Sequence, residues 1–381
     1  MWQRRVEKAT YPSATGTDQG ARGPVEQTAN YVQLFDANIR TFFREGLRVA
    51  RRDPGMVAFL LRTLLRQRKA ARTRGSWARR GVHVPPFMIA SITNRCNLNC
   101  KGCYAKAHHR QPTPELSPGR LGEVFSEAQD LGISIILLAG GEPLTRPEIL
   151  DITAQTPKVV FPLFTNGLLI DKTVVDALRE QRNVVPVLSI EGHETETDDR
   201  RGEGVYRHLT AVMDKLRAAG VFFGTSTTIT SQNMGAVLAG AYVRELYERG
   251  CRLFFFIEYV PVQPGTECLE LDEEQRQRAL ARIDALRRDV PALFAAFPGD
   301  EAMYGGCLAA GRGFVHLGAS GSLEPCPFSP YSDVSLADTS LVEALQSPLL
   351  RTIRESDVEL AETTGGCALW ERRDWVASLL T

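Results

Sequence analysis

The sequence has no long hydrophobic run and no excess of charge of either sign. Its longest apolar runs, 133–139 and 253–257, have the length of a strand, far below the roughly 20 residues that a membrane helix needs. The N-terminal segment has early positive charge but no hydrophobic stretch behind it, so it does not resemble a secretory signal. These absences predict a cytoplasmic protein.

What the composition does contain is typical of a globular enzyme-sized chain. Hydrophobic residues make up 43% of the 381 residues and charged residues 24%, which excludes a disordered or low-complexity chain. The 45 basic and 45 acidic side chains cancel, but unevenly along the chain. Residues 44–80 contain twelve Lys or Arg against Glu45 and Asp53, a net charge of +10, so the remainder carries −10.

The pattern of apolar residues divides the chain into four regions. Residues 1–30 have no apolar periodicity and are predicted to form a mobile tail, whereas 31–85 form a basic helical extension of two amphipathic helices. Residues 86–290 alternate short β-type runs with amphipathic helices, as parallel β/α units do. Strands are expected near 88–93, 133–139, 159–165, 184–190, 222–229 and 253–259, and helices near 120–131, 172–182, 206–219, 236–249 and 272–288.

Six such repeats predict a partial (β/α)6 barrel of the TIM type, an α/β fold. Residues 291–381 are predicted to form a second, small module with a hairpin of 314–317 and 322–324.

Three cysteines follow the first predicted strand within eight residues: Cys96, Cys100 and Cys103. Clustered thiolates suit a soft metal centre. A structural zinc site normally closes with four protein ligands, and only His108 and His109 lie nearby as further candidates. A cubane held by three cysteines leaves one iron open to a substrate or cofactor.

The Cys-x3-Cys-x2-Cys spacing followed by Tyr104 resembles the radical S-adenosylmethionine (radical SAM) superfamily. A second motif of that family, Gly140-Gly141-Glu142-Pro143, stands at the end of the second predicted strand. Further matches at strand ends are Asn166, Ser189 and, after the fourth strand, Arg201. The similarity covers roughly residues 85–260.

The resemblance implies a role for each position. Cys96, Cys100 and Cys103 would hold a [4Fe-4S] cluster whose free iron binds SAM. Tyr104 would lie near the adenine, and Gly140, Gly141, Glu142 and Pro143 near the SAM ammonium. Asn166, Ser189 and Arg201 would complete the cofactor site, with Ser189 near the ribose or carboxylate and Arg201 paired with the carboxylate.

The activity implied by the resemblance is that of a radical SAM oxidoreductase or transferase. Such an enzyme reductively cleaves SAM to a 5′-deoxyadenosyl radical, which abstracts hydrogen from a substrate. The outcome would be oxidation or C–C or C–S bond formation on a peptide, small molecule, tetrapyrrole or lipid, with a flavodoxin or ferredoxin as reductant. The alternative is a non-catalytic metal-binding or maturation-scaffold protein, which would leave SAM intact.

A looser set of cysteines, Cys307, Cys326 and Cys367, stands in the C-terminal region. It resembles the auxiliary-cluster module known as SPASM, or its shortened twitch form, and implies a second [4Fe-4S] cluster. The full SPASM pattern has seven cysteines, so buried thiols in a vestigial module are the alternative. Cys268 is a distant candidate for a fourth ligand, and Cys251 is expected in the core.

The basic helical extension leaves several partners open. Its leucines and arginines suit contact with a membrane surface, an anionic substrate, or simply the barrel with a solvated basic face. Nucleic acid is disfavoured, because aromatic residues are not interleaved with the charges.

Overall fold

The computed structural model describes residues 39–49, 54–108, 113–297, 306–356 and 367–380. Its centre is one nine-stranded sheet in the order β7-β6-β5-β4-β3-β2-β1-β8-β9, in which only β9 is antiparallel to its neighbour. The strands are β1 (Phe87–Thr93), β2 (Ile135–Gly140), β3 (Phe161–Thr165), β4 (Val184–Ser189), β5 (Gly224–Ile229), β6 (Leu253–Glu258), β7 (Leu293–Phe297), β8 (Phe314–Leu317) and β9 (Leu323–Glu324).

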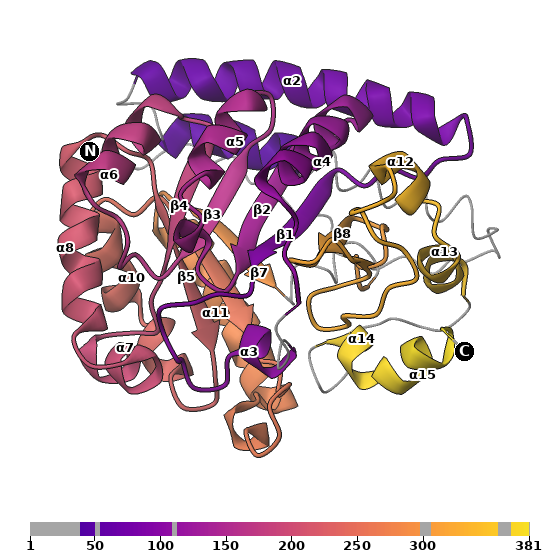
Figure 1. Cartoon of the computed structure of the whole chain (residues 1–381). Helices are drawn as coiled ribbons and strands as arrows, with labels where there is room; N and C mark the ends of the chain where they lie inside the picture. Colours follow the sequence, from indigo (N-terminus) through magenta and orange to yellow (C-terminus); the bar gives the residue numbers. More distant parts are fainter. Residues whose placement is uncertain (1–38, 50–53, 109–112, 298–305, 357–366, 381) are drawn as a thin grey trace, which may run out of the picture.

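Helices connect the strands and cover the outer face of the sheet (Figure 1). They are α3 (Tyr104–His108), α4 (Pro118–Leu131), α5 (Ile149–Gln155), α6 (Lys172–Glu180), α7 (Glu194–Arg201), α8 (Val205–Ala218), α9 (Met234–Val237), α10 (Gly240–Glu248) and α11 (Glu273–Asp289). The six predicted strands and the helices between them are confirmed, with one difference. The helix expected near 236–249 is broken into α9 and α10, because the backbone of Ala239 is extended.

The sheet is larger than the six predicted repeats. Strand β7 follows α11 and pairs with β6, while β8 pairs in parallel with β1 on the other side. The predicted hairpin therefore exists as β8 and β9, but it extends the barrel sheet. The rings of Phe297 on β7 and Phe314 on β8 lie 5.6 Å apart, so the sheet curls until its two sides meet. The partial-barrel class is confirmed with two additional parallel strands.

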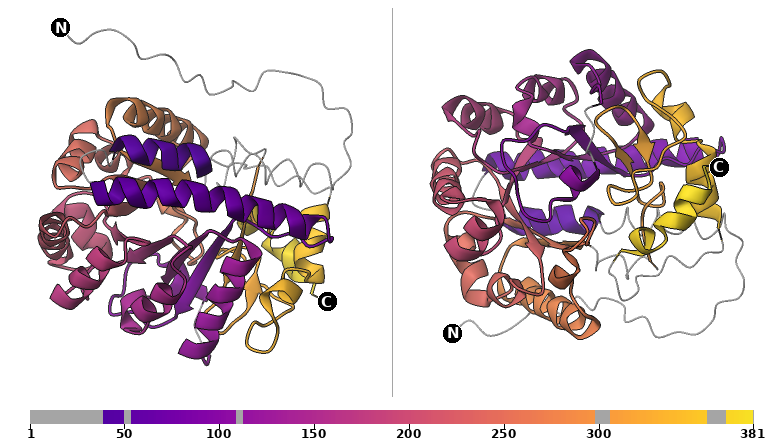
Figure 2. Two further views of the ribbon diagram at one scale, coloured as in Figure 1. Left: turned by 90° about the horizontal axis from the view of Figure 1, so that it is seen from above. Right: turned by 60° about the horizontal axis from the view of Figure 1, so that its bottom comes forward.

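The N-terminal helices close one end of this barrel. Residues 39–49 are helical, and α2 (Pro54–Ala78) runs across the same end (Figures 1 and 2). Their apolar side chains form a core with the first residues of the strands, including Val185, Leu253 and Leu293. We call this the closed end, and the end formed by the carboxyl ends of the strands the mouth. No described helix is long and apolar enough to cross a membrane.

The C-terminal region packs beside β1, β8 and α4. It contains α12 (Leu341–Ala344), α13 (Pro348–Glu355), α14 (Ala368–Glu371) and α15 (Arg373–Ser378), and short 3-10 turns occur at Pro143–Thr145 and Glu267–Leu269. Apolar residues of these helices belong to the same core as the barrel. The predicted tail, 1–30, lies outside the described residues.

Candidate functional site

The three clustered cysteines lie in the loop between β1 and α3, at the mouth. Glu115 holds the start of this loop, since its carboxylate accepts hydrogen bonds from the Thr93 hydroxyl (2.7 Å) and the Asn94 amide (2.9 Å). Burial raises the pKa of the Cys96 thiol, and the nearby thiols of Cys100 and Cys103 raise it further. The thiols of Cys100 and Cys103 therefore lie close enough to Cys96 to affect its pKa.

The glycine pair after β2 packs against the cysteine loop. The amides of Gly141 and Glu142 donate to the carbonyl oxygens of Thr93 (2.7 Å) and Arg95 (2.8 Å). A Cβ atom on Gly140, whose φ is +114°, would lie 2.4 Å from the Thr93 oxygen, and one on Gly141 would lie 2.1 Å from the Arg95 oxygen. Only glycine permits this approach. The glycines thus position the cysteine loop, while their expected contact with SAM stays a prediction.

The buried side chain of Glu142 links the ends of β2 and β3. Its side chain accepts hydrogen bonds from the amides of Leu144 (3.0 Å) and Asn166 (2.7 Å) and from the Thr165 hydroxyl (2.8 Å). Burial raises the pKa of this carboxyl although the hydrogen bonds oppose the change. Three donors leave about one of its four acceptor positions for a further donor. Asn166 in turn donates to the Asn97 side chain in the cysteine loop (2.7 Å).

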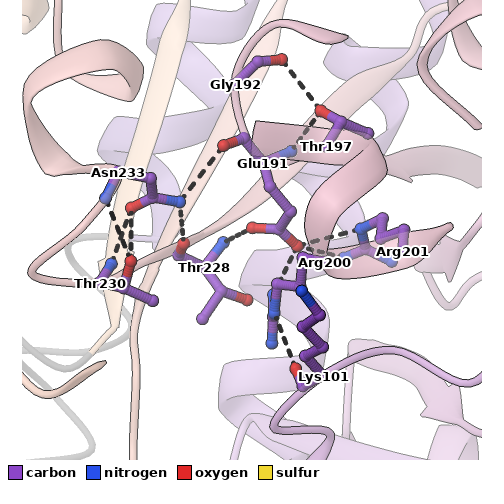
Figure 3. A network of polar contacts seen from close by, with 9 residues as sticks. All are labelled: Lys101, Glu191, Gly192, Thr197, Arg200, Arg201, Thr228, Thr230 and Asn233. Atoms are coloured by element: carbon purple, nitrogen blue, oxygen red, sulfur yellow. Dashed lines mark hydrogen bonds and ion pairs between the residues drawn. The ribbon is translucent and has the colours of Figure 1, made fainter. Parts of the chain in front are cut away.

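A second buried acid, Glu191, forms ion pairs with two arginines of α7 (Figure 3). Its Oε1 accepts from Arg200 (2.5 Å) and Arg201 (3.0 Å from Nε), and its Oε2 accepts from the Thr228 amide (2.9 Å). Burial acts to raise the pKa of Glu191, but the two guanidinium groups outweigh it and the net shift is downward. Arg201, expected to bind the SAM carboxylate, is here held by a carboxylate of the chain.

The arginines also join α7 to the cysteine loop. The Lys101 amide donates to the Arg200 carbonyl (2.9 Å), and the Arg200 side chain donates back to the Lys101 carbonyl (3.2 Å). Arg201 favours the charged form of the nearby Cys100 thiol, although burial has the larger effect and raises its pKa. Ser189 stands half-buried at the end of β4, opposite Ser226 in the sheet register.

The sequence analysis assigns no site role to Glu191. The available signal was an acid at a strand end followed by two arginines nine and ten residues later. Their pairing depends on how α7 folds back over β4, which the local sequence does not show.

Tyr104 begins a buried polar chain that was also not anticipated. Its ring packs against Phe328 at 5.2 Å. Burial raises the pKa of Tyr104, while a hydrogen bond with Ser91 opposes this. The Ser91 hydroxyl bonds Nε2 of His316 (2.8 Å), and Nδ1 of His316 bonds Glu324 (2.7 Å). This chain of contacts connects the cysteine loop with β8 and β9.

The second set of cysteines also comes together, although its members are up to sixty residues apart. Burial raises the pKa of Cys326 well above its usual range, and a hydrogen bond to Cys367 and the nearby Cys307 thiol raise it further. Cys268 is exposed in the loop that follows β6, next to Tyr259. Cys251 is fully buried in the core, as expected.

In the described parts of the chain, no three His, Cys, Asp or Glu side chains are grouped so that they could hold a single metal ion.

An aromatic cavity of about 280 Å³ lies between α3 and the C-terminal region. Arg373 stacks over the Trp370 ring, 4.4 Å from its centroid. Two of its walls lie near cysteines in the sequence, since α3 follows Cys103 directly and Phe328 is two residues after Cys326. Its lining consists of Ala107, His108, Val262, Phe328, Pro330, Tyr331, Trp370 and Arg373.

Known proteins resemble this chain in sequence. The pattern of the radical SAM superfamily matches residues 90–237. The chain is 27% identical over 322 residues to an AdoMet-dependent heme synthase of Methanosarcina barkeri, which covers 76% of this chain and 89% of that protein. It is 24% identical over 313 residues to the mycofactocin maturase MftC of Mycobacterium ulcerans, covering 76% and 82% of the two chains.

The fold has known counterparts as well. The crystal structure of Streptococcus suis SuiB bound to precursor peptide SuiA matches with a TM-score of 0.63 at 17% identity, over 82% of this chain and 75% of SuiB. SuiB bound to S-adenosylmethionine matches with a TM-score of 0.62.

These comparisons confirm the expected barrel class, the enzyme class and the family cofactors, a [4Fe-4S] cluster and SAM. The scaffold alternative is set aside, because the relatives are named as synthases and maturases. The family match thus spans the barrel from β1 to α9, so residues 90–237 form a radical SAM domain.

Proposed function

We propose that this enzyme binds a [4Fe-4S] cluster through Cys96, Cys100 and Cys103 and uses it to cleave SAM beside a substrate at the mouth. The observation that carries the proposal is that hydrogen bonds hold the cysteine loop, which follows β1, against the ends of three further strands. The Gly141 amide connects the loop to the end of β2. Asn166, whose amide donates to Glu142, connects the loop to the end of β3 through its side chain. The Lys101 amide donates to Arg200, which in turn bonds Glu191 at the end of β4. When bound, the cluster and SAM supply one-electron reduction and hydrogen-atom abstraction.

The SAM site is assigned to the residues around Glu142. Its remaining acceptor position suits an ammonium group, and the buried setting strengthens such a contact. Gly140, Pro143, Asn166, Ser189 and Tyr104 line the same strand ends. Arg201 keeps one guanidinium edge on Glu191, so we assign Glu191 as the residue that positions Arg201 for an anionic group.

Cys307, Cys326 and Cys367 are proposed to hold a second [4Fe-4S] cluster. They converge from three separate segments and are buried or half-buried, as ligands of a cluster shielded from water would be. A protein reductant such as a flavodoxin or ferredoxin would deliver the electrons to the enzyme.

The aromatic cavity is the proposed substrate site. Flat aromatic groups stack on Trp370, Tyr331 and Phe328, and Arg373 offers a positive charge for a carboxylate. A tetrapyrrole with carboxylate side chains combines both properties, and one edge of it fills a cavity of about 280 Å³. The heme synthase matches over most of both chains at 27% identity, slightly above the 24% of the mycofactocin maturase, and this similarity supports the tetrapyrrole class.

The experiment uses anaerobically reconstituted protein with dithionite, SAM and an iron porphyrin that carries carboxylates. We expect 5′-deoxyadenosine release that the porphyrin stimulates, and porphyrin binding that quenches tryptophan fluorescence. Trp370→Leu should weaken porphyrin binding about fivefold, since an aromatic pair contributes about 1 kcal/mol beyond its buried area. Trp375→Leu is the matched control, because Trp375 packs on the core and does not line the cavity.

The outcomes separate the parts of this proposal. Absence of SAM cleavage in iron-loaded protein contradicts the proposed reaction. Cleavage without porphyrin binding, or equal binding by both tryptophan variants, contradicts the proposed substrate and leaves a peptide as the next candidate.

A further inference from the structure

Helix α2 presents two different faces. The inner face belongs to the barrel: Gln67 accepts a hydrogen bond from Ser134 (2.7 Å), and Arg66 and Arg74 donate to the carbonyl oxygens of Pro157 and Gly132. Packing against the barrel, one of the alternatives left open by the sequence, therefore accounts for this face.

The outer face remains unexplained by that packing. Six exposed residues follow one another at helical spacing and form a single stripe. We call it the basic stripe: Leu61, Arg62, Leu65, Arg68, Lys69 and Arg72.

The chemistry of the basic stripe is unusual for a solvated surface. Leu61 and Leu65 are 49% and 65% exposed, and they are two of the four large hydrophobic residues exposed in the described parts of the chain. Helix α2 contains no Asp or Glu. No ion pair with a described carboxylate is formed by the four cations of the stripe. The stripe thus combines uncompensated positive charge with apolar side chains in water.

We propose that the basic stripe docks this enzyme on an anionic lipid bilayer surface. Such a surface offers phosphate groups to the four cations and acyl chains to the two leucines. A nucleic acid would satisfy only the charges, because the stripe has no aromatic side chain for stacking. A second copy of the chain would bring like charges together, which is unfavourable.

The place of the stripe fixes the orientation of the docked enzyme. Helix α2 covers the closed end of the barrel, and α3 with the cysteine loop lies at the opposite end (Figure 1). Docking through the stripe would leave the mouth open to the aqueous phase. The surface therefore serves attachment, and the proposal is independent of the SAM reaction.

The test is co-sedimentation of the full chain with vesicles. Binding is expected to phosphatidylcholine vesicles that contain about 30% phosphatidylglycerol, and not to phosphatidylcholine alone. Raising the salt from about 0.1 M to about 0.5 M should weaken it, because screening shortens the range of the attraction. Each basic residue near the surface contributes about fivefold, so Arg68→Gln with Lys69→Gln should weaken binding about 25-fold.

A matched control changes the same charge elsewhere. Arg207→Gln with Arg278→Gln removes two exposed cations from the mouth-side halves of α8 and α11, and should bind vesicles as the unchanged protein does. Leu61→Ser with Leu65→Ser should weaken binding while keeping the salt dependence. SAM cleavage should be unaffected in all these variants.

Three outcomes would overturn the proposal. They are failure to bind anionic vesicles, equal loss in the stripe and control variants, and a stripe-dependent interaction with an RNA oligonucleotide or with a second copy in place of vesicle binding.

Discussion

The contact between the glycine pair and the cysteine loop makes a sharp prediction for Gly141→Ala. The added Cβ would lie 2.1 Å from the Arg95 oxygen, whereas real Cβ contacts are essentially never under 3.0 Å. The obstacle is backbone, so the loop must recede by about 0.9 Å or more. That movement stretches the hydrogen bond from Glu142 to Arg95, now 2.8 Å, beyond its useful range.

The size of the effect follows from these contacts. Loss of one or two buried hydrogen bonds and the strain of the shift should cost about 2–5 kcal/mol of the free energy of unfolding. A domain is commonly stable by about 5–15 kcal/mol, so most of the protein should still fold. Metal–ligand distances tolerate only about 0.2 Å, and a loop displaced by several times that amount should not hold its cluster.

The assay is iron and sulfide content after reconstitution, together with 5′-deoxyadenosine release. Gly141→Ala should fall from about eight to about four irons per chain, keeping the second cluster, and lose at least about 100-fold in SAM cleavage. Gly119→Ala is the matched control, since a Cβ there meets nothing within 4 Å in the first turn of α4. Full iron content and normal cleavage in Gly141→Ala would refute the assigned packing role.

Three further predictions concern the assigned residues. Changing Cys96, Cys100 and Cys103 together to Ala should abolish SAM cleavage and leave about four irons per chain, measured by iron analysis. If the variant still cleaved SAM, these cysteines would not be the ligands of the cluster that binds SAM. Cys326→Ala should lose about four irons while the absorbance of the SAM cluster remains, and an unchanged iron content would contradict a second cluster. Glu191→Gln should lower the free energy of unfolding by about 3–5 kcal/mol near pH 7, because it leaves two buried guanidinium groups without their carboxylate. The folded pKa of Glu191 lies below its unfolded value, so its contribution to the free energy of unfolding is complete above about pH 4.5 and is lost as the pH falls through the folded pKa. Thermal unfolding of the cluster-free protein should be followed from about pH 3 to about pH 7. The stability of the variant should fall less steeply toward acid pH than that of the unchanged protein.

Elements with a strong local pattern were predictable from the sequence. The six strands from β1 to β6 alternate with amphipathic helices, and most of their bounds agree with the structure to within two residues. Strand β7 was missed because five apolar residues directly after a long helix give no distinct period. Strand β8 was expected, but its pairing with β1 joins residues more than two hundred positions apart, and no local signal records such a pairing.

The candidate site shows the same division. Spacing alone identified the cysteine loop, because thiols three and four residues apart lie together whatever the rest of the chain does. The partner of Arg201 and the obstacle beside Gly141 lie on other loops, and only the curled sheet brings them there.

The sequence by itself determined the chemistry of this protein: three clustered thiols at a strand end, a glycine pair at the next, and a repeating β/α pattern that builds a barrel. Tertiary structure decided which groups meet. It brought Cys307, Cys326 and Cys367 together, buried Glu191 between two arginines, and turned one face of α2 into the barrel and the basic stripe outward. The physical reason is range, since spacing governs contacts within a few residues, whereas contacts between distant segments depend on how the whole sheet curls and packs.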